Sequence, residues 1–172
     1  MKKIAVDAMG GDFAPQSVVE GVEKARNKYP DLRFMLFGDE QKIREILTSD
    51  KNIEIIQTTE VIDMNDEPVK AIRRKKDSSL VKCMYMVKKG EADAMVSAGS
   101  TGANLVGGHV IIGRIKGVER PPLAPLIPTK TGFSLLIDCG ANVDARPSHL
   151  LQFAKMGSVY MENVVGIKNP KV

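Results

Sequence analysis

Residues whose types could do chemistry gather in three glycine-rich turns. The turns span 7–12 (DAMGGD), 97–104 (SAGSTGAN) and 138–144 (DCGANVD). Each follows a short apolar run of the kind that forms a buried strand. In open parallel sheets, ligands collect outside the carboxyl ends of the strands, and all three turns fit that position. These turns are therefore the candidate binding and catalytic positions of the chain.

The turn 97–104 is the strongest candidate for binding an anion. Its glycines let the backbone approach a ligand, and the helix expected after it would present free N–H groups and a positive dipole end. Ser100, Thr101 and Asn104 add neutral hydroxyl and amide donors. This set suits a phosphate or phosphoryl group, and the alternative is an ordinary helix cap. The predicted phosphate-binding residues are Gly10, Gly11, Ser97, Gly99, Ser100, Thr101, Gly102 and Asn104.

The first and third turns carry four carboxylates, which are Asp7, Asp12, Asp138 and Asp144. Carboxylates at strand ends could bind a metal, orient donors or act as a base. They could equally cap helices and brace turns. We favour a functional role for Asp7 and Asp138, and a structural one for Asp12 and Asp144.

Two further polar side chains complete the predicted catalytic set. Asn142 could donate to a developing oxyanion. His149 falls in the first turn of the last predicted helix, where a neutral ring could accept a proton or simply bond a neighbour. The predicted catalytic residues are Asp7, Asp138, Asn142 and His149.

Signatures of several other sites are absent. No Gly-Lys-Ser/Thr ends the turn 97–104, and no Gly-x-Gly-x-x-Gly occurs, so a dinucleotide is disfavoured. The two cysteines, Cys83 and Cys139, form neither a disulfide framework nor a metal cluster, and no metal site is predicted. Cys139 sits at a strand end, but a small buried thiol explains it better than a nucleophile does.

A run of cations between positions 70 and 89 contains a single acid, Asp77. The run is either the solvated face of a helix or a docking surface for an acidic partner. Nucleic acid is disfavoured, because the run has one aromatic residue, Tyr85, and no recognition module. The candidate docking residues are Lys70, Arg73, Arg74, Lys75 and Lys76.

Strand and helix patterns alternate along nearly the whole chain. Such alternation indicates an α/β fold of βαβ units, a three-layer α/β/α sandwich whose sheet is largely parallel and Rossmann-like. The proline-rich stretch 121–131 predicts an extended edge segment or a wrapped loop. Strands are predicted at 3–7, 32–37, 53–57, 92–97 and 133–138. Helices are predicted from Pro15, after Asp39, once or twice within 67–89, and over 147–162.

The length and composition of the chain are typical of a single domain. The 172 residues are 43% apolar and 27% charged, with a net charge of +4, which is typical of a globular protein. The N-terminus lacks a signal peptide and no apolar run reaches the roughly 20 residues of a membrane helix, so we expect a cytoplasmic protein. Residues 166–172 look like a turn entering a new strand, which predicts a truncated or divided chain.

An ordered set of motifs resembles the bacterial phosphate acyltransferase family. The motifs are 4–12 (IAVDAMGGD), 96–104 (VSAGSTGAN), 120–122 (RPP), 136–144 (LIDCGANVD) and 153–160 (FAKMGSVY). The resemblance implies a relative of phosphate acetyltransferases that acts as a homodimer. It also implies that family members continue well beyond Val172, with further sheet, helices and a surface that contacts the membrane.

The resemblance implies a reaction. Inorganic phosphate attacks the thioester of acyl-[acyl carrier protein], giving acyl phosphate for phospholipid synthesis without a cofactor. The product passes to a membrane glycerol-3-phosphate acyltransferase. Two alternatives stay open: a phosphate acetyltransferase-like enzyme that uses acyl-CoA, and a non-catalytic scaffold that recruits carrier protein.

Overall fold

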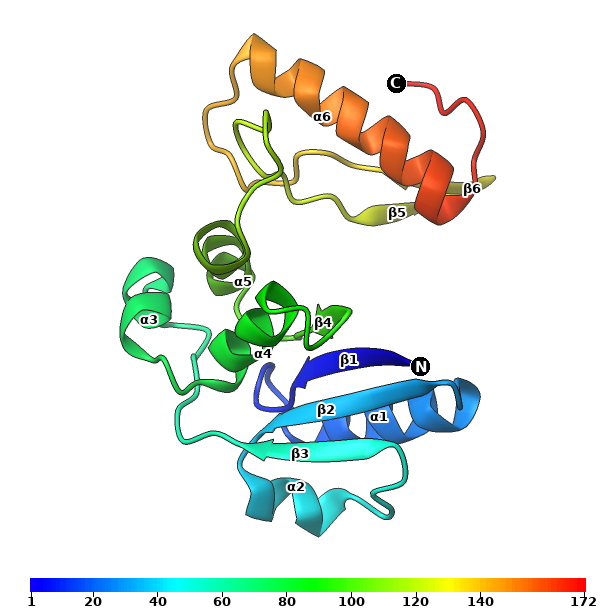
Figure 1. Cartoon of the computed structure of the whole chain (residues 1–172). Helices are drawn as coiled ribbons and strands as arrows, with labels where there is room; N and C mark the ends of the chain where they lie inside the picture. The colour runs from blue at the N-terminus through cyan, green and yellow to red at the C-terminus, as the bar shows by residue number, and fades with distance from the viewer. The chain divides into compact units, whose positions relative to one another are not determined.

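Four parallel strands form the sheet of the first part of the chain (Figure 1). The computed structural model describes all residues, 1–172, and divides into two compact units, Met1–Gly113 and Arg114–Val172. The strand order is β3-β2-β1-β4. The strands are β1 (Lys2–Asp7), β2 (Leu32–Gly38), β3 (Ile53–Gln57) and β4 (Ala94–Val96).

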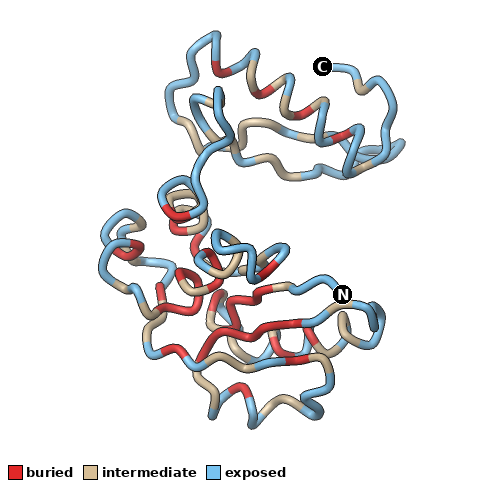
Figure 2. Tube along the Cα trace, in the orientation of Figure 1, coloured by how far each residue is buried: buried red, intermediate tan, exposed pale blue.

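Helices cover both faces of this sheet, because its central strands are apolar on both sides. Ile4 and Val6 pack with α1 (Gln16–Lys28) and α2 (Glu40–Ile46). Ala5, which points the other way, packs with Cys83 of α4 (Ser79–Lys88). Figure 2 shows the buried residues of this unit concentrated along its central strands. The predicted α/β/α layering is confirmed for this unit.

A second apolar cluster fixes the segment after β4. Helix α3 (Pro68–Arg74), α5 (Thr101–Gly107) and the π-helical turn η1 (Gly108–Ile112) pack with α4 around Ile72, Leu80 and Met84. Gly107 allows the close contact, because a Cβ there would collide with Met84 Sδ. The turn 97–104, which follows β4 and includes the first residues of α5, is thereby held in place.

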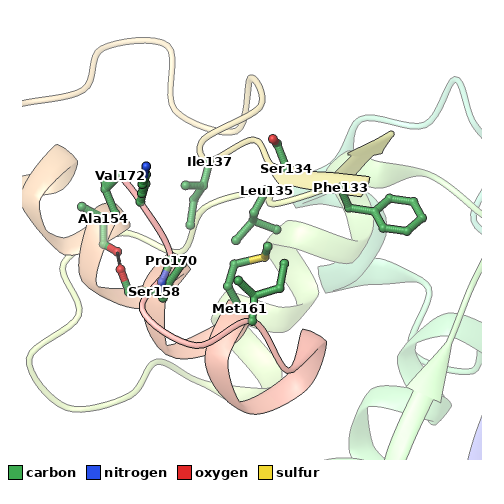
Figure 3. Close-up of a pocket in the computed structure, with 12 residues that line it drawn as sticks. Phe133, Ser134, Leu135, Ile137, Ala154, Ser158, Met161, Pro170 and Val172 are labelled. Carbon is green, nitrogen blue, oxygen red and sulfur yellow. Dashed lines mark hydrogen bonds between the residues drawn. The ribbon is translucent and has the colours of Figure 1, made fainter. Parts of the chain in front are cut away.

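The second unit is a hairpin with one helix. Strands β5 (Leu126–Thr129) and β6 (Gly132–Leu135) pair antiparallel, and α6 (Pro147–Tyr160) leads into the π-helical turn η2 (Met161–Val165). A pocket of about 300 Å³ lies within this unit, lined by Leu135, Ile137, Ala154 and Met161 among others (Figure 3). No helix of either unit combines the length and the apolar character that crossing a membrane requires.

The strand predicted at 133–138 differs from the observed one. It is shorter and pairs antiparallel with β5, which comes from the proline-rich stretch. The reason is the two-residue turn at 130–131, because so short a connection joins only antiparallel neighbours. β4 is likewise shorter than the predicted 92–97, and residues 166–172 form no strand. The strands predicted at 3–7, 32–37 and 53–57 are confirmed within a residue at each end.

The burial of Cys83 predicts a sharp difference between the two thiols. Burial, and secondarily the nearby Asp7 charge, raise the pKa of Cys83 above its ordinary range, while Cys139 is only half-buried. Because the thiolate is the reactive form, iodoacetamide at pH 8 should alkylate Cys139 on the order of 100-fold faster than Cys83. Peptide mass spectrometry over time measures both rates. Equal rates in the folded protein would contradict the described core, and equal rates in denaturant are the control.

Candidate functional site

Asp7 connects three elements at the carboxyl edge of the sheet. Its side chain ends β1 and is 3% exposed. Ser79 Oγ, from the start of α4, donates to Asp7 Oδ1 over 2.5 Å. Ser97 Oγ, which follows β4, donates to Asp7 Oδ2 over 2.7 Å. No cation lies within ion-pair distance of Asp7. The buried carboxylate therefore depends on hydroxyl donors for compensation.

The Ser97 hydroxyl forms all of its hydrogen bonds within the chain. Because its proton goes to Asp7, its oxygen accepts from Gly99 N at 3.1 Å and from Asn104 Nδ2 at 3.4 Å. Asn104 Nδ2 also donates to Ser100 O at 3.1 Å. The hydrogen bonds among Asp7, Ser97 and Asn104 thus stay within the chain. Their main effect is to stabilise the conformation of the turn.

Free donors remain at the start of α5. Ser100 caps this helix, since its Oγ accepts from Ala103 N at 3.3 Å, and its own proton stays available. The N–H groups of Thr101 and Gly102 form no hydrogen bond within the chain. The Thr101 side chain is exposed. Two N–H groups and two hydroxyls, all neutral, form a donor set that suits an oxyanion.

The first two glycine-rich turns lie against each other, as expected from neighbouring strands β1 and β4. A Cβ on Gly10 would overlap Asp7 Oδ2 and lie 2.9 Å from Gly99 N. A Cβ on Gly99 would lie 3.3 Å from Gly10 Cα. Gly11 has a φ of +109°, a conformation that favours glycine. The turns 7–12 and 97–104 therefore form one backbone-lined site.

Gly102 has a packing role that sequence reasoning did not anticipate. A Cβ at this position would approach Pro68 Cγ to 2.7 Å. Gly102 therefore lets α5 lie close to α3. Helix packing alone is a sufficient reason for a glycine at this position, whether or not a ligand binds. A larger residue at position 102 would disturb helix packing first, so it is a poor probe of binding.

The third turn lies in the second unit and is braced by Asp138. Asp138 Oδ1 accepts from Leu123 N at 2.7 Å, and Oδ2 accepts from Asn142 N at 2.7 Å and Asn142 Nδ2 at 3.1 Å. Partial burial raises the pKa of Asp138, but these donors outweigh it and the pKa lies below its ordinary value. Asn142 Nδ2 also donates to Pro121 O at 3.3 Å. Asp138 and Asn142 together fasten the proline-rich stretch to the turn.

His149 lies in the first turn of α6, as predicted. The structure adds that its side chain is buried and that both ring nitrogens have partners. Nδ1 accepts from Arg146 N at 3.2 Å, so the proton of the neutral ring lies on Nε2. Nε2 is 3.1 Å from Glu119 Oε2. These bonds give His149 a helix-capping and loop-fastening role in the second unit.

Comparison with known proteins shows the family of this chain. A family model described as fatty acid synthesis protein matches residues 2–172. The chain belongs to this family. A phosphate acyltransferase of Ligilactobacillus salivarius is 72% identical over 175 residues, covering 100% of this chain and 53% of that protein. A phosphate acyltransferase of a Geobacillus species is 56% identical over 171 residues, covering 99% and 52%. The chain spans about half the length of these relatives.

A solved structure supports the fold of this fatty acid synthesis family member. The branched-chain phosphotransacylase of Enterococcus faecalis superposes with a TM-score of 0.56, covering 94% of this chain and 51% of that chain. Its sequence identity is 14%, so the likeness concerns the fold. The predicted α/β fold class is confirmed.

Nearby acidic residues neutralise part of the positive charge of the basic run at 70–89. Lys70 Nζ pairs with Glu67 at 2.7 Å. Lys75 Nζ pairs with Asp66 at 2.5 Å and donates to Val61 O at 2.7 Å. The other three candidate docking residues are exposed and form no ion pair, and they are Arg73, Arg74 and Lys76.

Sequence reasoning missed two partners of the predicted catalytic residues, one in each unit. Ser79 lies 72 positions from Asp7, and Glu119 lies 30 positions before His149, so neither has a local signal that links it to its partner. The one available hint was the Ser78-Ser79 pair before an apolar run, which is typical of a helix start.

The contact between turns predicts that Gly10 is critical for stability. Gly10→Ala places a methyl group on the Asp7 carboxylate and should lower the free energy of unfolding by about 1–3 kcal/mol. Gly108→Ala is the matched control, because a Cβ there meets nothing within 4 Å and alanine favours the helix. Urea unfolding of both variants measures the difference. A Gly10→Ala protein as stable as the Gly108→Ala control would refute the described packing.

Proposed function

We propose that this chain supplies the phosphate site of an enzyme that transfers an acyl group from acyl-[acyl carrier protein] to inorganic phosphate. One observation carries the proposal: the donors of Ser100, Thr101 and Gly102 stay unpaired at a backbone-lined turn. The names of the relatives, which are phosphate acyltransferases, supply the chemistry that such a site would serve. The two units would then be parts of one α/β phosphate acyltransferase domain.

Neutral donors suit phosphate as a nucleophile. Hydrogen bonds from N–H and hydroxyl groups would hold phosphate without an adjacent cation, so the dianion keeps a lone pair available for attack. A phosphate oxygen would form a bond to the thioester carbonyl carbon, and the carbon–sulfur bond would break. The thiolate would leave with the electron pair and take a proton from solvent. No enzyme nucleophile and no cofactor is needed, so Cys139 has no required part.

The remaining predicted residues would assist in two ways. Asp7 would hold Ser97 and so fix the turn, which makes it a positioning residue. We retain Asp138, Asn142 and His149 as proposed catalytic residues, although their hydrogen bonds already support a bracing role. The developing oxyanion of the thioester needs a donor, and the Asn142 amide is the proposed one, which would require it to release Pro121 O or Asp138 Oδ2.

The proposed partner is an acidic carrier protein. Arg73, Arg74 and Lys76 form an exposed cationic patch, and none of the three forms an ion pair within the chain. Clustered cations raise the rate of encounter with an acidic protein and fix its register. Homodimer formation, peripheral membrane contact and delivery of product to a membrane acyltransferase are further proposals from the family resemblance.

The proposal predicts acyl phosphate formation by an intact enzyme built on this chain. A suitable enzyme is a chimera in which residues 1–172 are followed by the second half of the Ligilactobacillus salivarius relative, since the matched halves are 72% identical. Acyl-[acyl carrier protein] should release free carrier thiol only when phosphate is present, with acyl phosphate as the other product. Turnover of acyl-CoA alone would favour the phosphate acetyltransferase-like alternative. Release of no thiol from either donor by a folded chimera would favour the scaffold alternative.

Ser100 separates phosphate binding from helix capping within that assay. Aspartate and asparagine both cap helices well, but a carboxylate at this position would repel a dianion. Ser100→Asp should raise the KM for phosphate at least about tenfold above that of Ser100→Asn, with the KM for the acyl donor unchanged. Equal phosphate KM values in the two variants would exclude phosphate from this turn.

Charge reversal tests the docking patch. Changing Arg73, Arg74 and Lys76 to Glu should weaken binding of acyl-[acyl carrier protein] at least about tenfold and flatten its salt dependence, because clustered charges act within a Debye length of about 8 Å. The matched control changes the exposed Lys24, Lys28 and Lys51 to Glu and should leave binding unchanged. Binding is measured by calorimetry at two ionic strengths. Equal losses in both triple variants would place docking elsewhere.

A further inference from the structure

Two cations lie opposite each other near the amino ends of neighbouring strands. Lys3 of β1 and Arg33 of β2 are paired in the parallel register of these strands (Figure 1). Neighbouring strands are about 4.8 Å apart, and side chains at paired positions point to the same face. Both cations are exposed, whereas Ala5 and Met35, the next residues on that face, are buried with the α4 core. Like charges directly opposite each other repel and cost stability.

Neither cation has an ionic partner within the chain. No carboxylate lies within ion-pair distance of Lys3 or Arg33. Asp93 contacts the Lys3 backbone, since its Oδ2 accepts from Lys3 N at 2.8 Å. Its Oδ1, however, pairs with Lys2 Nζ at 2.7 Å. The repulsion between Lys3 and Arg33 is therefore not relieved by an ion pair.

The two cations line a cleft of about 210 Å³. A water molecule occupies about 30 Å³ in the liquid, so the cleft has room for an anion larger than water. Asn52 and Glu54 are the other polar residues of the lining. The cleft therefore combines charge and space, which an isolated pair of surface cations does not.

Asn52 adds a neutral donor to the cleft. Its carbonyl oxygen accepts from Phe34 N at 2.9 Å, and its Nδ2 donates to Pro30 O at 3.2 Å. These two bonds fix both the backbone and the side chain of Asn52. The amide group carries two hydrogens, so one of them remains available to a ligand. The cleft thus offers donors from β1, from β2 and from the residue before β3.

Glu54 is the one acidic residue of the lining. It is exposed and forms no ion pair. The register pairs Glu54 with Met35, so it lies diagonally from Arg33 on the neighbouring strand. With one carboxylate and two cations, the lining keeps an excess of one positive charge. Glu54 reduces the attraction for an anion, and its removal should increase that attraction.

The donor set favours a phosphate group among anions. The planar guanidinium of Arg33 can donate to two phosphate oxygens at once, and the Lys3 ammonium adds a point charge. A phosphate monoester has three terminal oxygens, which can accept from Arg33, Lys3 and Asn52 together. A carboxylate has only two oxygens, and both would be used by the guanidinium.

The cleft is separate from the turns proposed to hold the reacting phosphate. Lys3 lies near the amino end of β1 and Asp7 ends the strand. Four residues of a strand span about 13 Å, so one phosphate group cannot contact both ends. An anion in the cleft is therefore not the nucleophile of the proposed reaction.

We propose that Lys3, Arg33 and Asn52 form a second anion site, which binds a phosphate group carried by a soluble phosphate ester or by a phospholipid headgroup. The guanidinium binds two oxygens, the ammonium neutralises the remaining charge and the Asn52 amide donates to the third oxygen. The bound phosphate relieves the repulsion between the two cations and so strengthens the pairing of β1 with β2. This inference does not depend on the proposed reaction.

NMR titration of chain 1–172 with inorganic phosphate tests the site, because amide shifts report on each residue separately. At constant ionic strength, phosphate should shift the amides of Lys3, Arg33 and Asn52 saturably. Arg33→Gln should weaken this binding at least about fivefold, because it removes charged hydrogen bonds, and Glu54→Gln should strengthen it. Lys24→Gln is the matched control, since Lys24 is an exposed cation outside the cleft.

Two outcomes would overturn the proposal. The first is the absence of saturable shifts at the three amides. The second is equal weakening by Arg33→Gln and Lys24→Gln, which would indicate a diffuse effect of net charge. Arg33→Lys is a milder second variant that keeps the charge and loses the guanidinium, and it should weaken binding less than Arg33→Gln. Shifts at residues 100–102 report the proposed reaction site separately, so either site can fail without the other.

Vesicles distinguish the two sources of the phosphate group. Sedimentation of the chain is compared between vesicles of phosphatidylcholine and vesicles that also contain phosphatidic acid. Extra sedimentation with phosphatidic acid that is lost in Arg33→Gln and kept in Lys24→Gln would assign the site to a lipid headgroup. Saturable phosphate shifts without such sedimentation would assign it to a soluble phosphate ester.

Discussion

The buried carboxylate of Asp7 is the constraint on which the first unit depends. It accepts hydrogen bonds from Ser79 and Ser97 and has no cationic partner. A buried charge without a counterion is costly, so each hydroxyl donor must be in place for the fold to tolerate it. The strand β1, the start of α4 and the turn after β4 are thereby fixed to one another. The glycines at positions 10 and 99 follow from the same constraint, because they leave space beside the carboxylate.

This arrangement divides the polar residues of the site into two groups. One group, centred on Ser97, uses its donors inside the chain and gives the turn its shape. The other group begins α5 and keeps its donors unpaired. A rigid turn with a few free donors is preorganised, because little conformational freedom is lost when an anion binds. The predicted phosphate-binding residues therefore have two different proposed roles. Some give the turn its shape, and the others offer donors to the anion.

The local sequence pattern was sufficient to predict the strands and turns that short stretches of sequence determine. The strands β1, β2 and β3 follow from apolar runs, and the turns 7–12 and 97–104 follow from glycine clusters at strand ends. Pairing partners were not predictable in the same way. The proline-rich stretch was predicted to be an edge segment or loop, and it forms β5, the partner of β6. The inward pairing of Lys75 with Asp66 was also missed, since a charge pattern does not tell which cations already have a partner.

The two hydroxyl contacts of Asp7 also order events during synthesis of the chain. Their sequence separations are 72 and 90 residues, so Asp7 is synthesised well before either of its donors. A nascent chain that ends before Ser97 cannot complete the shell of this carboxylate, so β1 cannot be buried stably at that stage. Contacts this distant along the chain are closed late and slow folding. Strand β1 is therefore made before the other three strands of its sheet, but its carboxylate is fully satisfied only after Ser97 has been made.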